Sequence, residues 1–315
     1  MQYFITGIAG FLGSALANRL SGEGHNVRGL DDLSTSQPNA LSPEIEFHQG
    51  DINDRPKLWT LLKNVDCVYH LAAKVSVPES ILYPREYNHI NVGGTVTLME
   101  AMRDVGVGRV VFISSGAIYG KQDVQTLKES TLPNPHSPYA VSKLAAEYYI
   151  RTIGNLYGIE TVCLRVFNAY GPKQPLPSVH APVIPNFLRQ SFLNGTLVIH
   201  GDGLQSRDYV YLDDVVNAMT AASTASDINH QIINVGSGTA TNVKDLARMA
   251  VEITGGEPEI VYNKKANLGP DQMRADLTLA KEVLNYQPLV SLEKGLKLTF
   301  EQDEQLHSTP QNETV

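Results

Sequence analysis

The sequence predicts an α/β protein built on a doubly wound parallel sheet, with a smaller, mixed α/β lobe in its C-terminal half. Short apolar runs alternate with helix-period segments through the first half of the chain, which is typical of parallel strands covered by helices on both faces. A glycine-rich loop follows the first apolar run, and several prolines interrupt the alternation after about residue 170. These three observations define the expected architecture.

The elements of the first half follow in a regular order. We expect strands at residues 2–7, 26–32, 45–51, 67–73, 109–115 and 160–168. Between them we expect helices at residues 13–24, 55–64, 90–106 and 139–158, where apolar side chains recur at helical spacing. Each helix can then cross from one parallel strand to the next.

The second half has a looser pattern. Its loop-rich start contains Pro172, Pro175, Pro177, Pro182 and Pro185, and it continues with strand-like runs at 196–203 and 230–238 and a helix-like segment at 243–256. We expect one lobe to contain residues 1–168 with a returning segment near 205–235. The other lobe then contains 169–204 and 236–305, and the polar residues 306–315 form a disordered tail.

Composition and charge exclude several classes of protein. The 315 residues are 42% hydrophobic and carry a net charge of −8 with no basic cluster, so nucleic acid is not an expected partner. No apolar run approaches the ~20 residues of a membrane span, and the N-terminus lacks the pattern of a signal peptide. Cys67 and Cys163 lie in apolar runs, which indicates buried free thiols in a reducing compartment and hence a cytoplasmic protein.

The glycine loop "TGIAGFLG" places Gly7, Gly10 and Gly13 in a G-x-x-G-x-x-G pattern between a strand and a helix. Glycines allow a tight turn and let backbone N–H groups approach a pyrophosphate at the start of a helix. This context predicts a Rossmann-type, dinucleotide-binding lobe; a ligand-free glycine turn is the alternative. We assign no metal ligands.

Acidic residues at two strand ends refine the identity of the expected cofactor. Asp31 and Asp32 end the second strand, where an acid binds the adenosine ribose hydroxyls and repels a 2′-phosphate, so NAD is favoured over NADP. Asp51 ends the third strand and could reach the adenine. A residue in its position is also a common cap of a strand end.

Tyr139 and Lys143 in "SPYAVSK" lie one helical turn apart if Ser137 caps a helix that starts at Pro138. A free tyrosine has a pKa near 10 and is a poor base at neutral pH. A nearby lysine and a positively charged nicotinamide can together lower that pKa by about 3 units. The sequence therefore predicts a general acid/base at Tyr139; a pair of solvated side chains is the alternative.

The combination of these motifs resembles one known family. The glycine spacing and "YAVSK" occur with "HLAAKVSVPES", "NVGGT", "VFISSGAIYG", "RVFNAYGPKQ", "GDGLQSRDYVYLDDV" and "INVGSG". In this order they resemble the extended short-chain dehydrogenase/reductase family of NAD-dependent nucleotide-sugar epimerases and dehydratases, over roughly residues 1–300. The resemblance implies an NAD-binding first lobe, a substrate-binding second lobe and a homodimer formed by the helices near 92–105 and 140–156. Amphipathic packing of these helices on the chain's own sheet is the alternative to the dimer contact.

The resemblance also implies roles for individual residues. Ser115, Tyr139 and Lys143 form the expected catalytic triad, with Asn91 as a supporting member; a turn at Ser115 and a polar kink at Asn91 are the alternatives. The expected cofactor site adds the remaining contacts, at Phe11, Leu12, Ser34, Ile52, Leu71, Ala72 and Ala73. The expected substrate site contains Lys74, Ser76, Ser115, Gly116, Asn168, Val183, Ile184, Phe187, Val198, His200, Arg207, Met273 and Arg274.

Some of these substrate assignments have structural alternatives. Core packing explains the apolar members as well as contact with a nucleobase does. Arg207 suits a diphosphate because of its planar guanidinium, although a salt bridge would also explain it. The expected second diphosphate arginine is absent, and Lys264, Lys265 or a shifted Arg274 could replace it.

The residues after Ser115 favour one reaction within the family. Gly116 and Ala117 stand where dehydratases carry an Asp-Glu pair and decarboxylating relatives a Glu. The expectation is therefore 4-epimerisation, with UDP-glucose and UDP-galactose as substrates. Met273, of intermediate size, lies where relatives limit the sugar pocket, so N-acetylhexosamines are further candidates. A CDP-, dTDP- or GDP-linked sugar, or a silent NAD-binding regulator, are the rival hypotheses.

Overall fold

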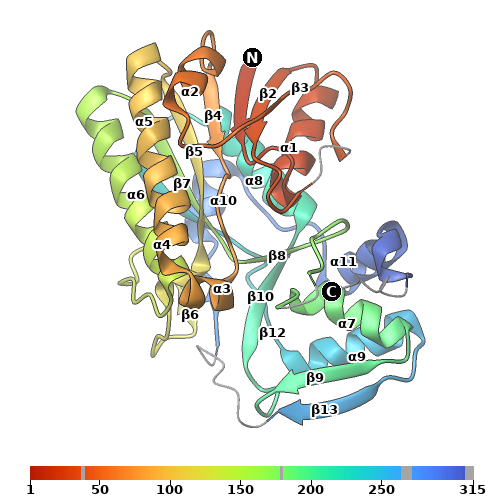
Figure 1. Cartoon of the computed structure of the whole chain (residues 1–315). Coiled ribbons are helices and arrows are strands. Elements are labelled where there is room, and N and C mark those ends of the chain that lie inside the picture. The colour runs from red at the N-terminus through yellow and green to blue at the C-terminus, as the bar shows by residue number, and fades with distance from the viewer. Residues whose placement is uncertain (37–39, 178–179, 264–271, 309–315) are drawn as a thin grey trace.

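The computed structural model describes residues 1–36, 40–177, 180–263 and 272–308 (Figure 1). Its largest element is a seven-stranded sheet of order β11-β7-β5-β4-β1-β2-β3, in which all neighbouring strands are parallel. The strands are β1 (Gln2–Thr6), β2 (Asn26–Asp31), β3 (Glu46–Gln49), β4 (Cys67–His70), β5 (Arg109–Ser115), β7 (Glu160–Val166) and β11 (Gln231–Val235). Because strand order reverses at β1, a crevice forms outside the carboxyl ends of β1 and β4.

Helices cover both faces of this sheet, which confirms the doubly wound α/β fold. One face packs against α1 (Phe11–Gly22), α8 (Leu212–Thr224) and α10 (Thr278–Leu284). The other packs against α2 (Arg55–Leu61), α5 (Gly94–Val105) and α6 (Pro138–Tyr157). The central strands β1, β4, β5 and β7 are largely buried on both sides, and they consist mostly of apolar residues.

The local sequence explains where α6 begins and ends. The Ser137 hydroxyl accepts a hydrogen bond from the backbone N–H of Ala140 at 3.2 Å, and Pro138 occupies the first helical position. The helix ends at Gly158, whose φ of 71° lies in the left-handed region. The predicted cap at Ser137 is confirmed.

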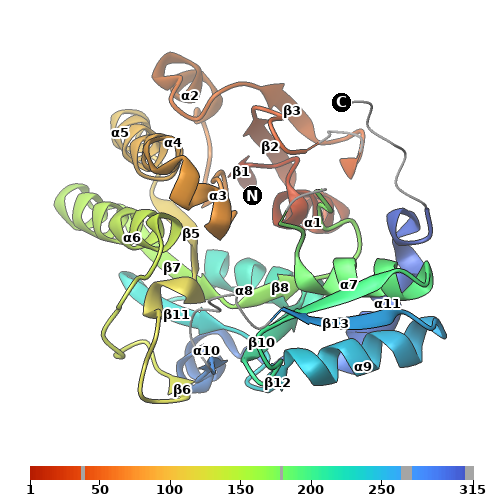
Figure 2. The same ribbon diagram turned by 60° about the horizontal axis from the view of Figure 1, so that its bottom comes forward.

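A smaller set of elements lies beside the carboxyl ends of the main sheet. It contains a three-stranded sheet of β8 (Asn168–Tyr170), β10 (Ser206–Tyr211) and β12 (Ala240–Asn242), and a parallel pair of β9 (Thr196–His200) and β13 (Glu259–Asn263). Figure 2 shows α9 (Val243–Thr254) running beside this pair. The core between them is completed by α7 (Val183–Phe192), α11 (Leu292–Gln302) and the short turn η4 (Glu304–Leu306).

A short parallel pair connects the two sets of elements. β6 (Thr126–Leu127), which follows β5 in the sequence, pairs with β14 (Arg274–Ala275) from the C-terminal region. Asp208 of β10 adds a contact, because its carboxylate accepts a hydrogen bond from the Ala275 N–H at 3.0 Å. The residue boundaries predicted for the two lobes stay a prediction. The disordered tail is expected at residues 306–315. Its first residue, Leu306, is buried, and residues 309–315 lie outside the described part.

Two of the expected elements differ in the structure. The strand expected at 160–168 ends at Val166, and after Phe167 the chain pairs with β10 as β8. The helix expected at 90–106 begins with a π-helical turn, η2 (Asn88–Gly93), before α5. The short elements α3 (Val77–Leu82), α4 (Pro84–Tyr87) and η3 (Gly116–Tyr119) have too few residues to show a hydrophobic period.

Cys67 and Cys163 are buried free thiols, as the sequence predicts. Burial raises the pKa of Cys67 to about 12 and raises that of Cys163 as well, so both thiols stay protonated at neutral pH. In the described part of the chain, no helix has the length and apolarity needed to cross a membrane.

Candidate active site

The glycine loop forms a close junction between β1, α1 and β4. Gly7 has a φ of 70°, and a Cβ there would lie 2.8 Å from the backbone nitrogen of Ala72. A Cβ on Gly13 would overlap the carbonyl oxygen of Gly7. No side chain caps α1, which starts after Gly10, so its first N–H groups remain available to an anion. This geometry fits the pyrophosphate of a dinucleotide.

The two acids at the end of β2 have different environments. Asp31 is buried, and its carboxylate accepts hydrogen bonds from the Ala9 N–H, the Leu33 N–H and the Ser36 hydroxyl at 2.9–3.0 Å. Asp32 is exposed and accepts the N–H of Ser34. Asp31 therefore fixes the loop against the glycine turn, and both carboxylates lie at the strand end expected to bind a ribose.

The other predicted cofactor residues surround this crevice. Ile52 is buried against Gly94 of α5, and Leu71 and Ala72 donate their N–H groups to the Thr6 hydroxyl at 3.2 Å. Phe11 and Leu12 pack at the start of α1, and Ala73 directly follows Ala72. Asp51 accepts hydrogen bonds from Asn53, so it caps the turn after β3.

Three predicted catalytic residues converge at the carboxyl end of β5. Tyr139 and Lys143 lie on the buried face of α6 and are 9% and 4% exposed. The Ser115 side chain lies close enough to the Tyr139 hydroxyl to influence its pKa, and the Lys143 ammonium donates to the Ile113 carbonyl at 2.8 Å. Helix α6 therefore places both side chains against the last residues of one strand.

Burial shifts the pKa values of Tyr139 and Lys143 in opposite directions, and each shift favours the neutral form of the side chain. It raises the pKa of Tyr139, and the Ser115 side chain offsets part of that increase. It lowers the pKa of Lys143 to about 7, and the negative charge of Glu147 opposes this decrease. The lowered pKa expected for Tyr139 stays a prediction for the NAD-bound protein, in which the positive nicotinamide would act on it.

Asn91 occupies the π-helical turn η2 and joins three segments. Its amide nitrogen donates to the Lys74 carbonyl at 3.0 Å and the Ser142 hydroxyl at 2.9 Å, and its amide oxygen accepts the Lys74 N–H at 2.8 Å. Ser142 in turn donates to the Tyr139 carbonyl. Asn91 is thus connected to the first turn of α6 and supports the position of Tyr139.

The predicted substrate residues after β4 are engaged in local contacts. The Lys74 ammonium pairs with Glu86 at 2.9 Å and with Glu79 at 3.5 Å, and this pairing raises the pKa of Lys74. The Ser76 hydroxyl accepts the Glu79 N–H and caps α3. These contacts hold both side chains in the segment after β4, and their predicted role in substrate binding stays a prediction.

The predicted nucleobase residues divide into buried and exposed sets. Ile184 and Phe187 of α7 are 2% and 3% exposed in the core of the smaller set of elements, which favours core packing for both. Val183 is only partly buried, and Val198 and His200 of β9 point to the exposed face of their strand. The exposed set is therefore the one available to a ligand.

Asn168 and Arg207 lie on adjoining strands. The Asn168 amide donates to the Asp208 carbonyl at 3.0 Å, and the guanidinium of Arg207 donates to the Ser206 carbonyl at 2.8 Å. Arg207 is partly buried. The role of Arg207 in binding a diphosphate stays a prediction.

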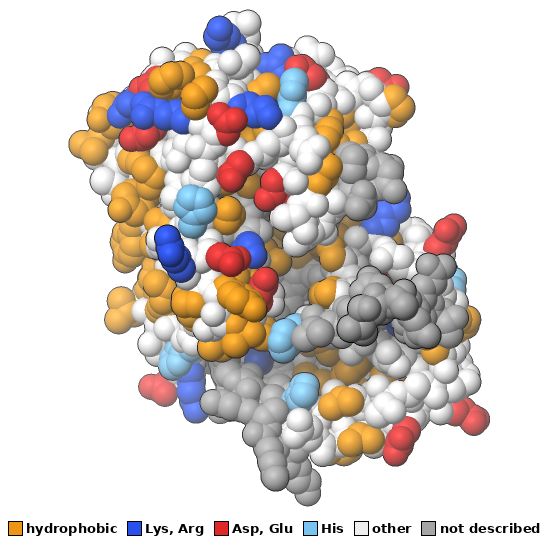
Figure 3. All heavy atoms as spheres, in the orientation of Figure 1, with side chains coloured by type: hydrophobic (Ala, Val, Ile, Leu, Met, Phe, Trp, Pro, Cys, Tyr) orange, Lys and Arg blue, Asp and Glu red, His pale blue; other side chains and the backbone are white. Residues whose placement is uncertain are grey.

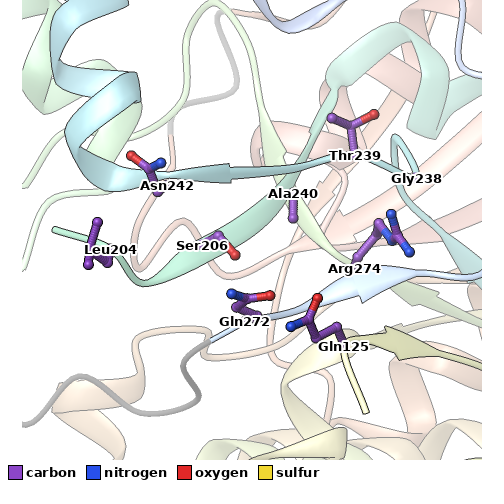
Figure 4. A pocket seen from close by; sticks show the side chains of 9 residues that line it. All are labelled: Gln125, Leu204, Ser206, Gly238, Thr239, Ala240, Asn242, Gln272 and Arg274. Atoms are coloured by element: carbon purple, nitrogen blue, oxygen red, sulfur yellow. The ribbon is translucent and has the colours of Figure 1, made fainter.

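Met273 directly precedes β14 and is buried, whereas Arg274, the first residue of β14, is exposed. Met273 is buried in one apolar cluster with Tyr119 and Phe167. The Phe167 ring also lies against Gly116, because a Cβ there would touch it at 3.2 Å. Met273 therefore packs in the same cluster as the residues that follow Ser115. Arg274 donates to the Thr126 hydroxyl at 3.0 Å. It also lines a polar cavity of about 390 Å³ whose other walls are Gln125, Leu204, Ser206, Gly238, Thr239, Ala240, Asn242 and Gln272 (Figure 4). Lys264 and Lys265 lie outside the described residues.

Tyr209 is a further candidate substrate-binding residue that the sequence did not lead us to predict. It lies two residues after Arg207 in β10, and its buried hydroxyl has no hydrogen-bond partner among the described residues. Burial raises its pKa to about 12, so the hydroxyl is protonated. Alternation along the strand puts Tyr209 on the same face as Arg207, and this period-two pattern was the available signal.

Comparisons with known proteins identify the family. The model of the NAD-dependent epimerase/dehydratase family matches residues 3–236, so the chain belongs to this family. The UDP-glucose 4-epimerase of Mycolicibacterium smegmatis is 38% identical over 310 residues, covering 96% of this chain and 98% of the relative. The family membership confirms the resemblance, the Rossmann-type fold and NAD as the cofactor.

Two solved structures are similar over nearly the full chain. The UDP-glucose 4-epimerase of Thermotoga maritima, solved with UDP-glucose, has a TM-score of 0.92 and 35% identity, covering 96% of this chain and 98% of that one. The UDP-N-acetylglucosamine 4-epimerase of Methanobrevibacter ruminantium, solved with UDP-N-acetylmuramic acid, has a TM-score of 0.91 and 30% identity, covering 96% and 97%. These two relatives act on different sugars.

Proposed function

We propose that the chain is an NAD-dependent 4-epimerase of nucleotide-diphospho-sugars, with UDP-glucose and UDP-galactose as its principal substrates. The observation that carries this proposal is the convergence of Ser115, Tyr139 and Lys143 at the end of β5, in the same parallel sheet whose glycine loop fits a dinucleotide. The full-length likeness to UDP-glucose 4-epimerases supports the choice of substrate.

The side chains suit the proton transfers of this reaction. The glycine loop of Gly7, Gly10 and Gly13 and the acid Asp31 would hold NAD, which would supply a reversible hydride acceptor for the sugar C4 carbon. In its phenolate form, Tyr139 takes the proton of the sugar 4-hydroxyl group and becomes a neutral phenol. It later returns that proton to the sugar oxygen, while Ser115 holds the sugar hydroxyl in line. The positive charge of Lys143 favours the phenolate form of Tyr139. Gly116 and Ala117 of η3 carry no carboxylate, so water elimination lacks its acid and base.

The decisive test replaces Tyr139 by phenylalanine, which keeps the ring and removes the hydroxyl. Tyr139→Phe should lower the rate of interconversion of UDP-glucose and UDP-galactose by at least about 10²-fold. Tyr157→Phe, at the exposed end of the same helix, is the matched control and should keep the wild-type rate. Undiminished interconversion by Tyr139→Phe would refute the mechanism.

Met273 leads us to infer that N-acetylhexosamines are accepted as well. Its flexible side chain forms part of the wall next to Gly116 and can adapt to a larger substituent. A panel of UDP-, dTDP-, CDP- and GDP-linked hexoses and of UDP-N-acetylglucosamine tests the substrate assignment. Turnover of UDP-glucose without detectable turnover of UDP-N-acetylglucosamine would contradict the inference about N-acetylhexosamines. If only a different nucleotide sugar reduces the bound NAD, that sugar is the substrate and UDP-glucose is not.

We also propose a homodimer formed through α5 and α6, working in the cytoplasm. Helix α6 exposes Val141, Tyr148, Tyr149 and Leu156, and Figure 3 shows hydrophobic side chains along the edge that α5 and α6 form. Such an unpartnered apolar stripe fits a second copy of the same helix pair. Sedimentation velocity should give a dimer for the wild type and for Leu132→Glu, and a monomer for Leu156→Glu. A monomeric wild type would contradict the proposal.

A further inference from the structure

A row of polar side chains crosses the main sheet beneath the catalytic residues. Ser114 of β5, Arg165 of β7 and Asn234 of β11 are partners in register on three neighbouring parallel strands. Side chains in register point to the same face of a sheet, and all three are 3% exposed or less. Because most of the buried residues of the sheet are apolar, a row of three neighbouring polar side chains needs a reason other than core packing.

Glu147 of α6 completes the row. Its carboxylate accepts hydrogen bonds from the Ser114 hydroxyl and from Nε and Nη2 of Arg165, at 3.0 and 2.8 Å for the guanidinium. The Arg165 guanidinium also donates to the Tyr119 hydroxyl at 3.0 Å, which donates to the Asn234 amide oxygen at 2.7 Å. The carboxylate is thus fixed from two strands and is 2% exposed.

The fixed carboxylate lies one helical turn after Lys143 on the same buried face of α6. Three consecutive residues of β5 therefore meet three residues of α6: the Ile113 carbonyl meets Lys143, Ser114 meets Glu147, and Ser115 meets Tyr139. The charge of Glu147 is therefore held one helical turn away from Lys143, whose ammonium contacts the Ile113 carbonyl near the end of β5.

The other titratable groups around Lys143 are neutral or positive. His70 of β4 has its pKa lowered to about 3 by burial and by the charge of Lys143, so its ring is neutral. Tyr139 is protonated, because burial raises its pKa. Arg165 faces Glu147 from β7 and is positive. Among the described residues, Glu147 is the acidic group that counteracts the burial of Lys143.

We propose that Glu147 is a positioning residue for Lys143: held by Arg165 and Ser114, its carboxylate keeps the ammonium charged and directed at the end of β5, where Tyr139 and Ser115 meet. A buried ion pair is often no more stabilising than apolar residues of the same volume. A role in setting the charge of Lys143 explains why this pair lies inside an apolar core. The importance of that charge for turnover rests on the proposed epimerase function; the charge effect itself does not.

A direct test measures the protonation of Lys143 in the full-length, ligand-free protein. The ¹³Cε signal of Lys143, assigned by its absence in Lys143→Met, is followed against pH by NMR. In Glu147→Gln its titration midpoint should be lower by about one pH unit. Glu147→Asp, which keeps the charge, should titrate closer to the wild type.

Asp214 provides a matched control. Its carboxylate is equally buried, but it lies on α8 at the opposite face of the sheet and accepts the N–H groups of Leu289 and Val290. Asp214→Asn should leave the Lys143 midpoint unchanged. If Glu147→Gln does not fold, the double variant Glu147→Met/Arg165→Met leaves no unpaired charge and should move the midpoint in the same downward direction.

Turnover adds a second readout. With saturating UDP-glucose, the pH at which kcat declines on the alkaline side should be lower in Glu147→Gln, with little change in KM. An unchanged Lys143 midpoint in Glu147→Gln, or an equal change in Asp214→Asn, would overturn the proposal. A lowered midpoint in a protein that turns over no nucleotide sugar would support it and refute the proposed epimerase function instead.

Discussion

At Gly13, the absence of a side chain determines how closely α1 approaches the strand before it. A Cβ at this position would overlap the carbonyl oxygen of Gly7 and lie 2.9 Å from the Cα of Ile8. Both obstacles are backbone atoms, which a rotamer change cannot relieve. The close approach keeps the first turn of α1 at the crevice, where its N–H groups face an anion.

Gly13→Ala should therefore abolish tight binding of NAD. The added methyl group pushes α1 away from the glycine turn, so the backbone N–H groups lose their alignment with the pyrophosphate. Gly22→Ala is the control on the same helix, because a Cβ there meets nothing within 4 Å. The NAD content of the purified proteins checks both variants, and retention of full cofactor by Gly13→Ala would contradict the assignment of the loop.

At the scale of an element, η2 shows how an irregular turn serves the site. A π-helical turn adds a residue to the helical winding and is frequent at functional sites. Here it places Asn91, which is 2% exposed, between the segment after β4 and the first turns of α6. An uninterrupted α-helix over the same residues would turn Asn91 to a different face.

Asn91→Ala should lower both stability and kcat. It leaves the N–H and carbonyl of Lys74 without their partners, which costs about 1–3 kcal/mol of the free energy of unfolding. It also releases the Ser142 contact next to Tyr139. Asn88→Ala, in the same π-helical turn but exposed, is the control.

Urea denaturation and steady-state kinetics measure the two effects of Asn91→Ala. If Asn91 supports Tyr139, kcat of Asn91→Ala should fall by a larger factor than the fraction of folded protein does. Equal behaviour of Asn91→Ala and Asn88→Ala would show that Asn91 has no such role.

At the scale of the molecule, Asp208 joins segments that are far apart in the sequence. Its buried carboxylate accepts hydrogen bonds from the N–H groups of Ser237, Gly238 and Ala275, and from the Ser237 hydroxyl. This connects β10, which carries Arg207, to the loop after β11 and to β14, which follows Met273. One side chain thus sets the spacing between several predicted substrate residues.

Asp208→Asn should decrease stability and raise KM for the nucleotide sugar more than it lowers kcat. An amide nitrogen replaces one acceptor oxygen and cannot accept these N–H groups, a loss of about 1–3 kcal/mol. Asp202→Asn, an exposed turn residue of the same region, is the control. Urea denaturation and initial-rate kinetics check the prediction; a KM equal to that of the control would separate Asp208 from substrate binding.

The sequence by itself determined the sheet, its covering helices, the glycine turn and the cap of α6. These features depend on local rules: strand and helix periods, glycine conformations and capping side chains repeat at short spacing along the chain. The pairing of Tyr139 with Lys143 was predicted from the helix cap at Ser137 and their spacing of one helical turn, whereas the triad with Ser115 was predicted from the family resemblance. The cofactor followed from the context of the glycines.

The tertiary structure decided what local pattern does not contain. The π-helical turn at Asn91, the change of sheet at Phe167 and the ion pairs of Lys74 depend on neighbours distant in sequence. The contact of Glu147 with Arg165 likewise joins a helix to a strand and appears in the sequence only as two charged residues in apolar surroundings. Burial and charge pairing are properties of packed neighbours, so only the folded chain fixes which polar groups work together.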